Sequence, residues 1–237
     1  MRWLALVLCV VASGAAAQCR QALALGLDVS GSVDAREYRL QIEGVTAALG
    51  SAPVRQALLA LPGNDVALMV YEWSGPGDSH VLLPWTDVTG EAALDAVIAA
   101  LGAAERRAST PGTGLGQAML DGAGFLAQRT DCARLTLDIS GDGKSNLGPR
   151  PGDVKAALAR AGITVNALVI GADAPAGGDA REVEISELSS YFRAQVIVGA
   201  DAFVQTALGF DAYADAMQAK LERELQVLIL SERTATR

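Results

Sequence analysis

The feature that most constrains the fold of this chain is a short apolar run that ends abruptly in an acid and two spaced serines. The segment LALGLDVSGSVD at 23–34 passes from leucines and alanine into Asp28, Ser30 and Ser32. Such a run, closed by a polar turn that contains glycine, is typical of a strand covered on both faces in a parallel α/β sheet. We therefore predict that these side chains stand at the carboxyl end of a buried strand, where ligands bind in open α/β sheets.

The residues after this loop predict a helix. Asp34 can cap its N-terminus, and Glu37, three residues later, can reach back to complete a capping box. Apolar side chains then recur at helical spacing, at Tyr38, Ile42, Val45 and Leu49. The acid and the two serines therefore lie in a strand-to-helix loop.

The rest of the chain alternates strand and helix patterns. The predicted strands lie at 65–73, 80–85, 163–170 and 202–207. The predicted helices lie at 91–101, 151–161 and 184–192 and from Asp211, where Tyr213, Met217, Leu221, Leu225 and Leu228 share one face, and a loop rich in Gly, Ala and Asp occupies 171–180. With no internal repeat, we predict a single domain over 18–237. Its fold class is α/β: a Rossmann-like three-layer sandwich with a mostly parallel central sheet and helices on both faces.

Three oxygen-bearing side chains at alternating positions indicate a hard cation. Hydroxyls and carboxylates suit Mg²⁺, which keeps several of its waters and so needs few protein ligands. Serine and aspartate are also common caps and turn residues at such a junction. The DxSxS pattern alone therefore leaves both interpretations open.

Two further segments favour the cation. Thr113 lies between two glycines, just ahead of an amphipathic helical pattern, and glycine lets the backbone approach a ligand closely. A second apolar run, RLTLDISGDGKSN at 134–146, ends at Asp142 within a glycine turn. If the two strands are neighbours, five side chains converge on one point: Asp28, Ser30, Ser32, Thr113 and Asp142.

In this order, DVSGS, the Gly-Thr-Gly-Leu-Gly turn and SGDGKSN resemble the metal-ion-dependent adhesion site (MIDAS) of von Willebrand factor type A (VWA) domains. The resemblance implies that the first acid, both serines and the threonine surround Mg²⁺ directly or through water, and that the last acid does so through water. An acidic side chain of a partner protein then completes the octahedron. The residues implied as metal ligands are Asp28, Ser30, Ser32, Thr113 and Asp142.

Longer segments resemble an uncharacterised family of secreted bacterial proteins that contain this domain, classified only as a domain of unknown function. The segments are LDVSGSVDAREY, VYEWSGPG, LPWTDV and SGDGKSNLGP. The likeness covers essentially the whole chain after its first residues, and it implies a metal site without identifying a partner.

The first residues predict the compartment. Residues 1–17 combine one basic residue, an apolar core and small residues at the cleavage positions, which is the pattern of a secretory signal peptide cleaved after Ala17. The apolar core is short for a membrane span. Gln18 precedes Cys19, so the lipid-attachment pattern of bacterial lipoproteins is not met. We expect a periplasmic or secreted bacterial protein with no integral membrane span.

The cysteines left after this cleavage are Cys19 and Cys132. Cys19 lies nine residues before Asp28 and Cys132 ten residues before Asp142, so parallel neighbouring strands would hold both at nearly the same height. In an oxidising compartment this favours a disulfide over two free buried thiols.

Composition excludes some partners. The formal net charge is −8, and it becomes one unit more negative when Arg2 leaves with the signal peptide, which argues against nucleic acid as a partner. Arg106 and Arg107 precede the Thr113 loop and suit either a solvated face or attraction of an acidic partner. Trp73 and Trp85, with Tyr71 and Glu72, suit either a recognition surface or core packing.

Most enzyme classes are disfavoured. GDGKS at 141–145 resembles the end of a phosphate-binding P-loop, but Asp138 stands where the first glycine is required. His80 is the single histidine, so neither a histidine-containing nucleophilic triad nor a multi-histidine zinc site can form. We predict a non-enzymatic, adhesion-type module that binds Mg²⁺ (or Mn²⁺ or Ca²⁺) and a partner's Asp or Glu. The alternative is a metal-dependent phosphoester hydrolase, and the oligomeric state stays open.

Overall fold

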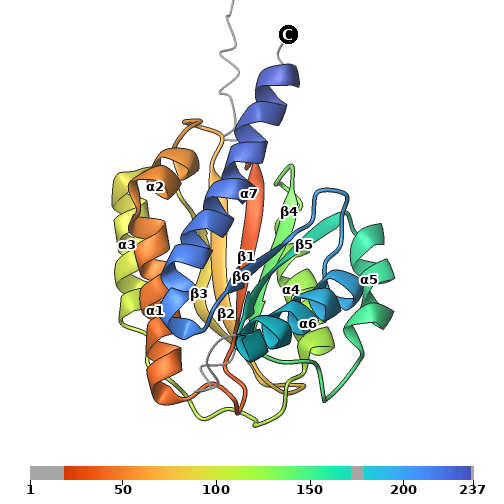
Figure 1. The fold of residues 1–237 in the computed structure, drawn as a ribbon. Helices are drawn as coiled ribbons and strands as arrows, with labels where there is room; N and C mark the ends of the chain where they lie inside the picture. Colours follow the sequence, from red (N-terminus) through yellow and green to blue (C-terminus); the bar gives the residue numbers. More distant parts are fainter. Residues whose placement is uncertain (1–18, 172–178, 236–237) are drawn as a thin grey trace, which may run out of the picture.

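The computed structural model describes residues 19–171 and 179–235, and it confirms the predicted α/β sandwich (Figure 1). The central sheet has the strand order β3-β2-β1-β4-β5-β6, and all neighbouring pairs are parallel except β2 and β3. The strands are β1 (Gln21–Asp28), β2 (Val66–Trp73), β3 (Ser79–Asp87), β4 (Leu135–Gly141), β5 (Ile163–Ile170) and β6 (Val204–Ala207).

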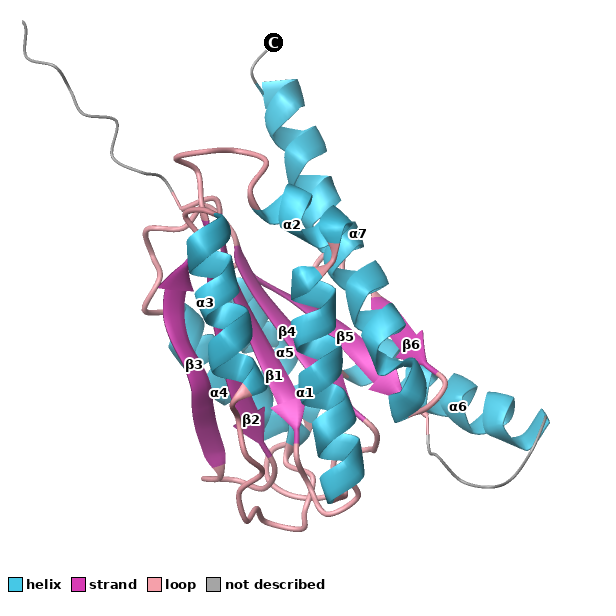
Figure 2. Cartoon of the chain, turned by 90° about the vertical axis from the view of Figure 1, so that its left-hand side faces the viewer, coloured by secondary structure: helices cyan, strands magenta, loops and turns pink. Residues whose placement is uncertain are grey.

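Helices cover both faces of the sheet. One face carries α1 (Ala35–Gly50), α2 (Ala52–Leu58), α3 (Glu91–Gly102) and α7 (Tyr213–Ala235), and Figure 2 shows α1, α3 and α7 in front of the strands. The other face carries α4 (Leu115–Leu126), α5 (Pro151–Arg160) and α6 (Asp179–Gln195). Within the described ranges, no helix has both the length and the apolar character needed to cross a bilayer.

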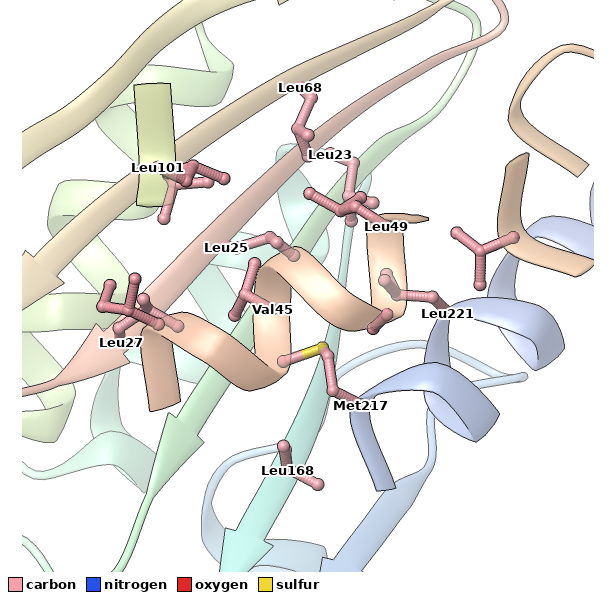
Figure 3. Close-up of a cluster of buried hydrophobic side chains, with 14 of the residues drawn as sticks. Leu23, Leu25, Leu27, Val45, Leu49, Leu68, Leu101, Leu168, Met217 and Leu221 are labelled. Atoms are coloured by element: carbon pink, nitrogen blue, oxygen red, sulfur yellow. The ribbon is translucent and has the colours of Figure 1, made fainter. Parts of the chain in front are cut away.

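Strand β1 is buried along its whole length and fixes the loop that follows it. Leu23, Leu25 and Leu27 point to one face of the sheet, where the cluster that they form includes Val45 of α1 and Met217 of α7 (Figure 3). Full burial of one such leucine contributes about 1.5 to 3 kcal/mol. The carboxyl end of β1 is therefore held by the centre of the core.

The predicted capping box is confirmed. The Asp34 carboxylate accepts the backbone N–H groups of Arg36 and Glu37, and Glu37 Oε2 accepts the backbone N–H of Asp34 at 2.7 Å. Because this cap fixes the first turn of α1, the loop between Asp28 and Asp34 has a defined length and direction.

Three helical regions differ from the sequence prediction. Helix α6 extends over Asp179–Gln195, beyond the predicted 184–192. Helix α2 was not predicted, because its seven residues are too few to show a helical period, although Pro53 in its first turn is a start signal. A 3₁₀ turn at Phe210–Ala212 precedes α7, which begins at Tyr213 rather than Asp211. Residues 1–17 and most of the predicted loop at 171–180 lie outside the described residues.

The predicted disulfide between Cys19 and Cys132 is confirmed, with a Cα–Cα distance of 4.4 Å. The β1–β4 register pairs Ala22 with Leu135, and the same offset continues to the two cysteines. Asp131 lies beside them, but both sulfurs are consumed by the bond, so this cluster is not a metal site. The bridge lies at the amino ends of the strands.

Candidate functional site

The five predicted ligand residues all lie at the carboxyl end of the sheet. Asp28 is the last residue of β1, and Asp142 directly follows β4, which is the parallel neighbour of β1. Ser30 and Ser32 lie in the loop between β1 and α1, and Thr113 lies two residues before α4. These segments meet among the loops at the bottom of Figure 1.

Hydrogen bonds link the five side chains. Ser32 Oγ donates to Asp142 Oδ1 at 2.8 Å, and the backbone N–H of Ser30 donates to Asp28 Oδ1 at 2.8 Å. The hydroxyl oxygens of Ser30 and Ser32 are 3.3 Å apart, and Thr113 Oγ1 lies 3.5 Å from Ser30 Oγ. Three hydroxyls and two carboxylates therefore lie together, although they come from three separate loops.

Burial makes this cluster electrostatically unusual. Asp28 and Ser30 are fully buried, Thr113 is 7% exposed, and Asp142 is half-buried. Burial, and after it the negative charge of Asp142, raises the pKa of Asp28 to about 7. Burial also raises the pKa of Asp142.

The second carboxylate oxygen of Asp28 indicates what kind of group the cluster can bind. Asp28 Oδ2 is buried and accepts no hydrogen bond from the part of the chain that the structure describes. A buried acceptor without a partner costs about 1 to 3 kcal/mol, and more when it is charged. A divalent cation among these oxygens would satisfy Oδ2 and offset the repulsion between the two acids, so the donor set fits a hard cation.

A second set of contacts holds the Thr113 loop in place. The backbone N–H of Thr113 donates to Asn146 Oδ1 at 2.8 Å, and the Thr113 carbonyl accepts the backbone N–H of Asn146 at 2.9 Å. Ser109 Oγ donates to the carbonyl of Val29 at 2.6 Å on the other side. Sequence reasoning did not assign this role to Asn146 or Ser109; the position of Asn146 in SGDGKSN was the available signal.

Glycine allows the two loops to approach each other. A Cβ on Gly31 would lie 2.9 Å from the carbonyl oxygen of Pro111, a contact that side chains do not tolerate. The backbone N–H of Gly31 donates to that same oxygen at 3.0 Å. The glycine between the two serines is therefore required for close packing against the Thr113 loop.

The aromatic residues do not form a recognition surface. Tyr71 and Trp73 are buried under α4, where Tyr71 Oη donates to the carbonyl of Ala118 at 2.8 Å, and Glu72 is 3% exposed. Trp85 is half-buried on the edge strand β3. The core-packing interpretation is the correct one, because β2 has a strand on each side and helices over each face.

The remaining candidate residues lie around the site without joining it. Arg106 and Arg107 are exposed, and Arg106 Nη2 donates to the carbonyl of Val33 at 2.7 Å. His80 is half-buried and pairs with Glu72 across β2 and β3. Asp138, which replaces the first P-loop glycine, is buried inside β4, so no phosphate loop forms there.

This chain matches a known protein family. A family model described as "Protein of unknown function (DUF1194)" matches residues 18–229. The chain belongs to the DUF1194 family. Among curated protein sequences, none matches this DUF1194 chain.

Solved structures identify the fold of this DUF1194 chain as VWA-like. Proximal thread matrix protein 1 from the mussel byssus has a TM-score of 0.60 and 12% identity, over 88% of this chain and 47% of that protein. The pilus adhesin SpaC from Lactobacillus rhamnosus GG has a TM-score of 0.60 and 16% identity, over 89% and 30%. A von Willebrand factor type A protein from Catenulispora acidiphila has a TM-score of 0.55 and 15% identity, over 87% and 43%.

The DUF1194 chain thus spans about half the length of the mussel protein and less of the other two. A further structure of the mussel protein holds zinc in its MIDAS motif (TM-score 0.59, 12% identity, over 90% of this chain and 47% of that one). At these identities the likeness shows a common fold, and the chemistry of the site has to be argued from the residues of this chain.

Proposed function

We propose that this chain is a divalent-cation-dependent protein-binding module of the adhesion type. The ligands are Asp28, Ser30, Ser32, Thr113 and Asp142, and the ion is Mg²⁺, with Mn²⁺ or Ca²⁺ as substitutes. The observation that carries the proposal is the buried Asp28 carboxylate, whose Oδ2 has no hydrogen-bond partner among the described residues at the point where three hydroxyls and a second acid meet.

The number of donors explains why the ion would bind a partner. Mg²⁺ requires close to ideal octahedral coordination by six oxygens. Five side chains that each offer one oxygen leave at least one position to water or to an incoming ligand. Three of the five are neutral hydroxyls and Asp142 would act through water, so the ion keeps positive charge that favours an anionic group there, such as the carboxylate of an Asp or Glu on a partner protein.

The same proposal includes a location and a domain organisation. A disulfide is typical of oxidising compartments, which supports export into the periplasm or beyond after removal of residues 1–17. Mussel matrix and pilus adhesin proteins among the structural neighbours support an extracytoplasmic binding role. We assign residues 18–237 to one VWA-like domain.

The first arm of the test measures metal binding by thermal melts of the mature chain in Mg²⁺ and in EDTA. An ion that binds only the folded state stabilises it by roughly 2.7 kcal/mol at a hundredfold excess over its Kd. We expect Mg²⁺ to raise the melting temperature of the wild type and of Asp153→Ala, an exposed acid on α5, but not of Asp28→Ala or Asp142→Ala. Identical melting temperatures in Mg²⁺ and in EDTA would contradict the proposed metal site.

The second arm separates binding from catalysis. Immobilised protein should retain partners from a periplasmic fraction with Mg²⁺, and both chelator and Thr113→Ala should weaken that capture while the fold survives. Purified protein should not turn over a generic phosphoester faster than Mg²⁺ or Mn²⁺ alone. Hydrolysis that requires both the metal and Asp28, tested with Asp28→Asn, would establish the hydrolase instead.

A further inference from the structure

A polar cavity of about 360 Å³ lies at the opposite end of the sheet, beneath α7. It is bounded by the first residues of β1, β4 and β5, by the segment before β6 and by the middle of α7. Figure 1 shows α7 running from the carboxyl end of the sheet to beyond its amino end, where the helix covers these strands. A cavity of this size holds a small metabolite.

The wall of the cavity is a preorganised set of buried polar side chains. Gln21 Nε2 donates to Thr136 Oγ1 at 2.8 Å, which holds the two amino-terminal strand positions together. Asn166 donates to Glu224 Oε1, and its own Oδ1 accepts the backbone N–H of Phe203 at 3.1 Å. These contacts fix amides, a hydroxyl and a carboxyl where a parallel sheet under a helix is normally apolar.

Two oxygens on this wall are without a hydrogen-bond donor among the described residues. Gln21 Oε1 and Glu224 Oε2 are buried and accept no hydrogen bond from any residue that the structure describes. Gln21 is 2% exposed and Glu224 is 7% exposed, and both line the cavity. Two buried acceptors on residues that line one cavity favour a ligand that carries several N–H donors.

The buried charges favour a positive group on that ligand. Lys220 is fully buried and forms an ion pair with Asp138, while its Nζ lies 3.6 Å from Glu224 Oε2. One ammonium therefore faces two carboxyls, and burial is the main cause that raises the pKa of Glu224, to about 8. A second ammonium would allow both carboxyls to be ionised at once.

The rim of the cavity has the opposite preference. Arg134 and Arg223 line it, and the Arg223 guanidinium lies 3.9 Å from the centre of the Phe203 ring, which positions it at the mouth. Asp201 is the acid on this rim. Two guanidinium groups against one carboxylate suit an anionic end of the ligand, because guanidinium binds carboxylate with two parallel hydrogen bonds.

We infer that this cavity binds a small zwitterion, a free α-amino acid, with its ammonium group at Glu224 and Gln21 and its carboxylate at Arg134 and Arg223. The inference does not depend on the metal site, because no residue is shared between the two. Neutralisation of Glu224 by the ligand's ammonium supplies affinity, and the size of the cavity limits the side chain.

The test is a panel of the common L-amino acids, each at millimolar concentration, in thermal-shift measurements on the wild type. EDTA is present throughout, so a carboxylate cannot bind through a metal at the other end of the sheet. An amino acid at about ten times its Kd should raise the melting temperature by about 3 °C or more. If no member of the panel stabilises the protein, the inference is wrong.

Calorimetry on the stabilising amino acid then tests the two ends of the ligand. Its N-acetyl derivative and its methyl ester should each bind the wild type at least about tenfold more weakly than the free amino acid does. This comparison uses only the wild-type protein, so it does not depend on whether a variant folds. Glu224→Gln and Arg134→Gln should weaken binding similarly, while Arg193→Gln, an exposed arginine on α6, should leave it unchanged. Full affinity in both Glu224→Gln and Arg134→Gln would place the ligand elsewhere.

Discussion

Asp28 at the carboxyl end of the sheet and Asp138 in β4 are both buried, but only Asp138 has a cation beside it. Lys220 of α7 forms an ion pair with Asp138, and both side chains are almost fully enclosed. Asp28 forms no ion pair with any described residue, and its nearest charged neighbour is another acid, Asp142. The carboxyl end and the middle of one sheet therefore treat a buried carboxylate in opposite ways.

The difference indicates which buried charges belong to the fold and which belong to a ligand. A buried ion pair is internally balanced, so removal of one partner strongly destabilises the fold. A buried acid without a counter-ion weakens the folded state until something from solution binds it. Glu224 is intermediate, because it shares Lys220 with Asp138 and keeps one unpartnered oxygen.

The largest effect should come from the disulfide at the amino end. Cys19 and Cys132 are separated by 113 residues, and closing a loop of this length stabilises the fold by about 4 to 5 kcal/mol in the chain-entropy model. The double substitution Cys19→Ser, Cys132→Ser should lower the urea midpoint strongly and leave the Mg²⁺-induced rise in melting temperature intact. Loss of that rise in a folded double variant would show that the two ends are coupled.

Lys220→Met should have the next largest effect. It leaves Asp138 and Glu224 without their ammonium, which costs about 3 to 5 kcal/mol for a buried pair. The matched control is Lys144→Met at the carboxyl end, where Lys144 pairs with Glu187 while its side chain is 50% exposed. That change should cost less than about 1 kcal/mol in urea unfolding. Equal losses in the two variants would contradict the contrast between the two ends.

The carboxyl end could be predicted from sequence because its residues are local. Asp28, Ser30 and Ser32 stand within five positions, and each of the other segments brings its own glycine turn. The pattern also predicted the strands β1 and β4, although it left open whether they are neighbours. Three loops were enough to specify the five donors, because β1 and β4 lead directly into theirs and a glycine turn ahead of α4 presents Thr113.

The amino end could not be predicted in this way. Its polar residues are single substitutions inside apolar strands, and Lys220 lies beside Leu221 in a helix whose predicted apolar stripe is buried at Tyr213, Met217, Leu221 and Leu225. The predicted fifth member of the stripe, the side chain of Leu228, lies outside the described residues. Asp138 served only to exclude a P-loop. What brings Lys220 to Asp138 is the path of α7 across the sheet, and one sequence does not specify that path.

The smallest effect, and the sharpest separation of the two ends, is in the pH dependence of stability. Burial and Asp142 raise the pKa of Asp28 to about 7, and burial and Asp138 raise the pKa of Glu224 to about 8 against the opposing effect of Lys220. An acid whose pKa is higher in the folded state stabilises that state fully below the unfolded pKa, and this stabilisation is lost as pH rises through the folded pKa. Both acids should therefore make the stability of the metal-free protein fall as the pH rises from about 4 to about 8.

Melting temperatures across this range, in EDTA and in Mg²⁺, should distinguish the two acids. In EDTA at pH 8, Asp28→Asn and Glu224→Gln should each melt a few degrees above the wild type, since a change of about 1 kcal/mol corresponds to roughly 2 to 4 °C for a chain of this size. Mg²⁺ should reverse the order for Asp28→Asn, because the ion stabilises the wild type at Asp28 and cannot do so in the variant. It should leave the advantage of Glu224→Gln unchanged. Two results would contradict this assignment: a Mg²⁺-dependent difference in melting temperature between Glu224→Gln and the wild type, or no Mg²⁺-dependent difference between Asp28→Asn and the wild type. Either would mean that Asp28 is not the carboxylate that the cation neutralises.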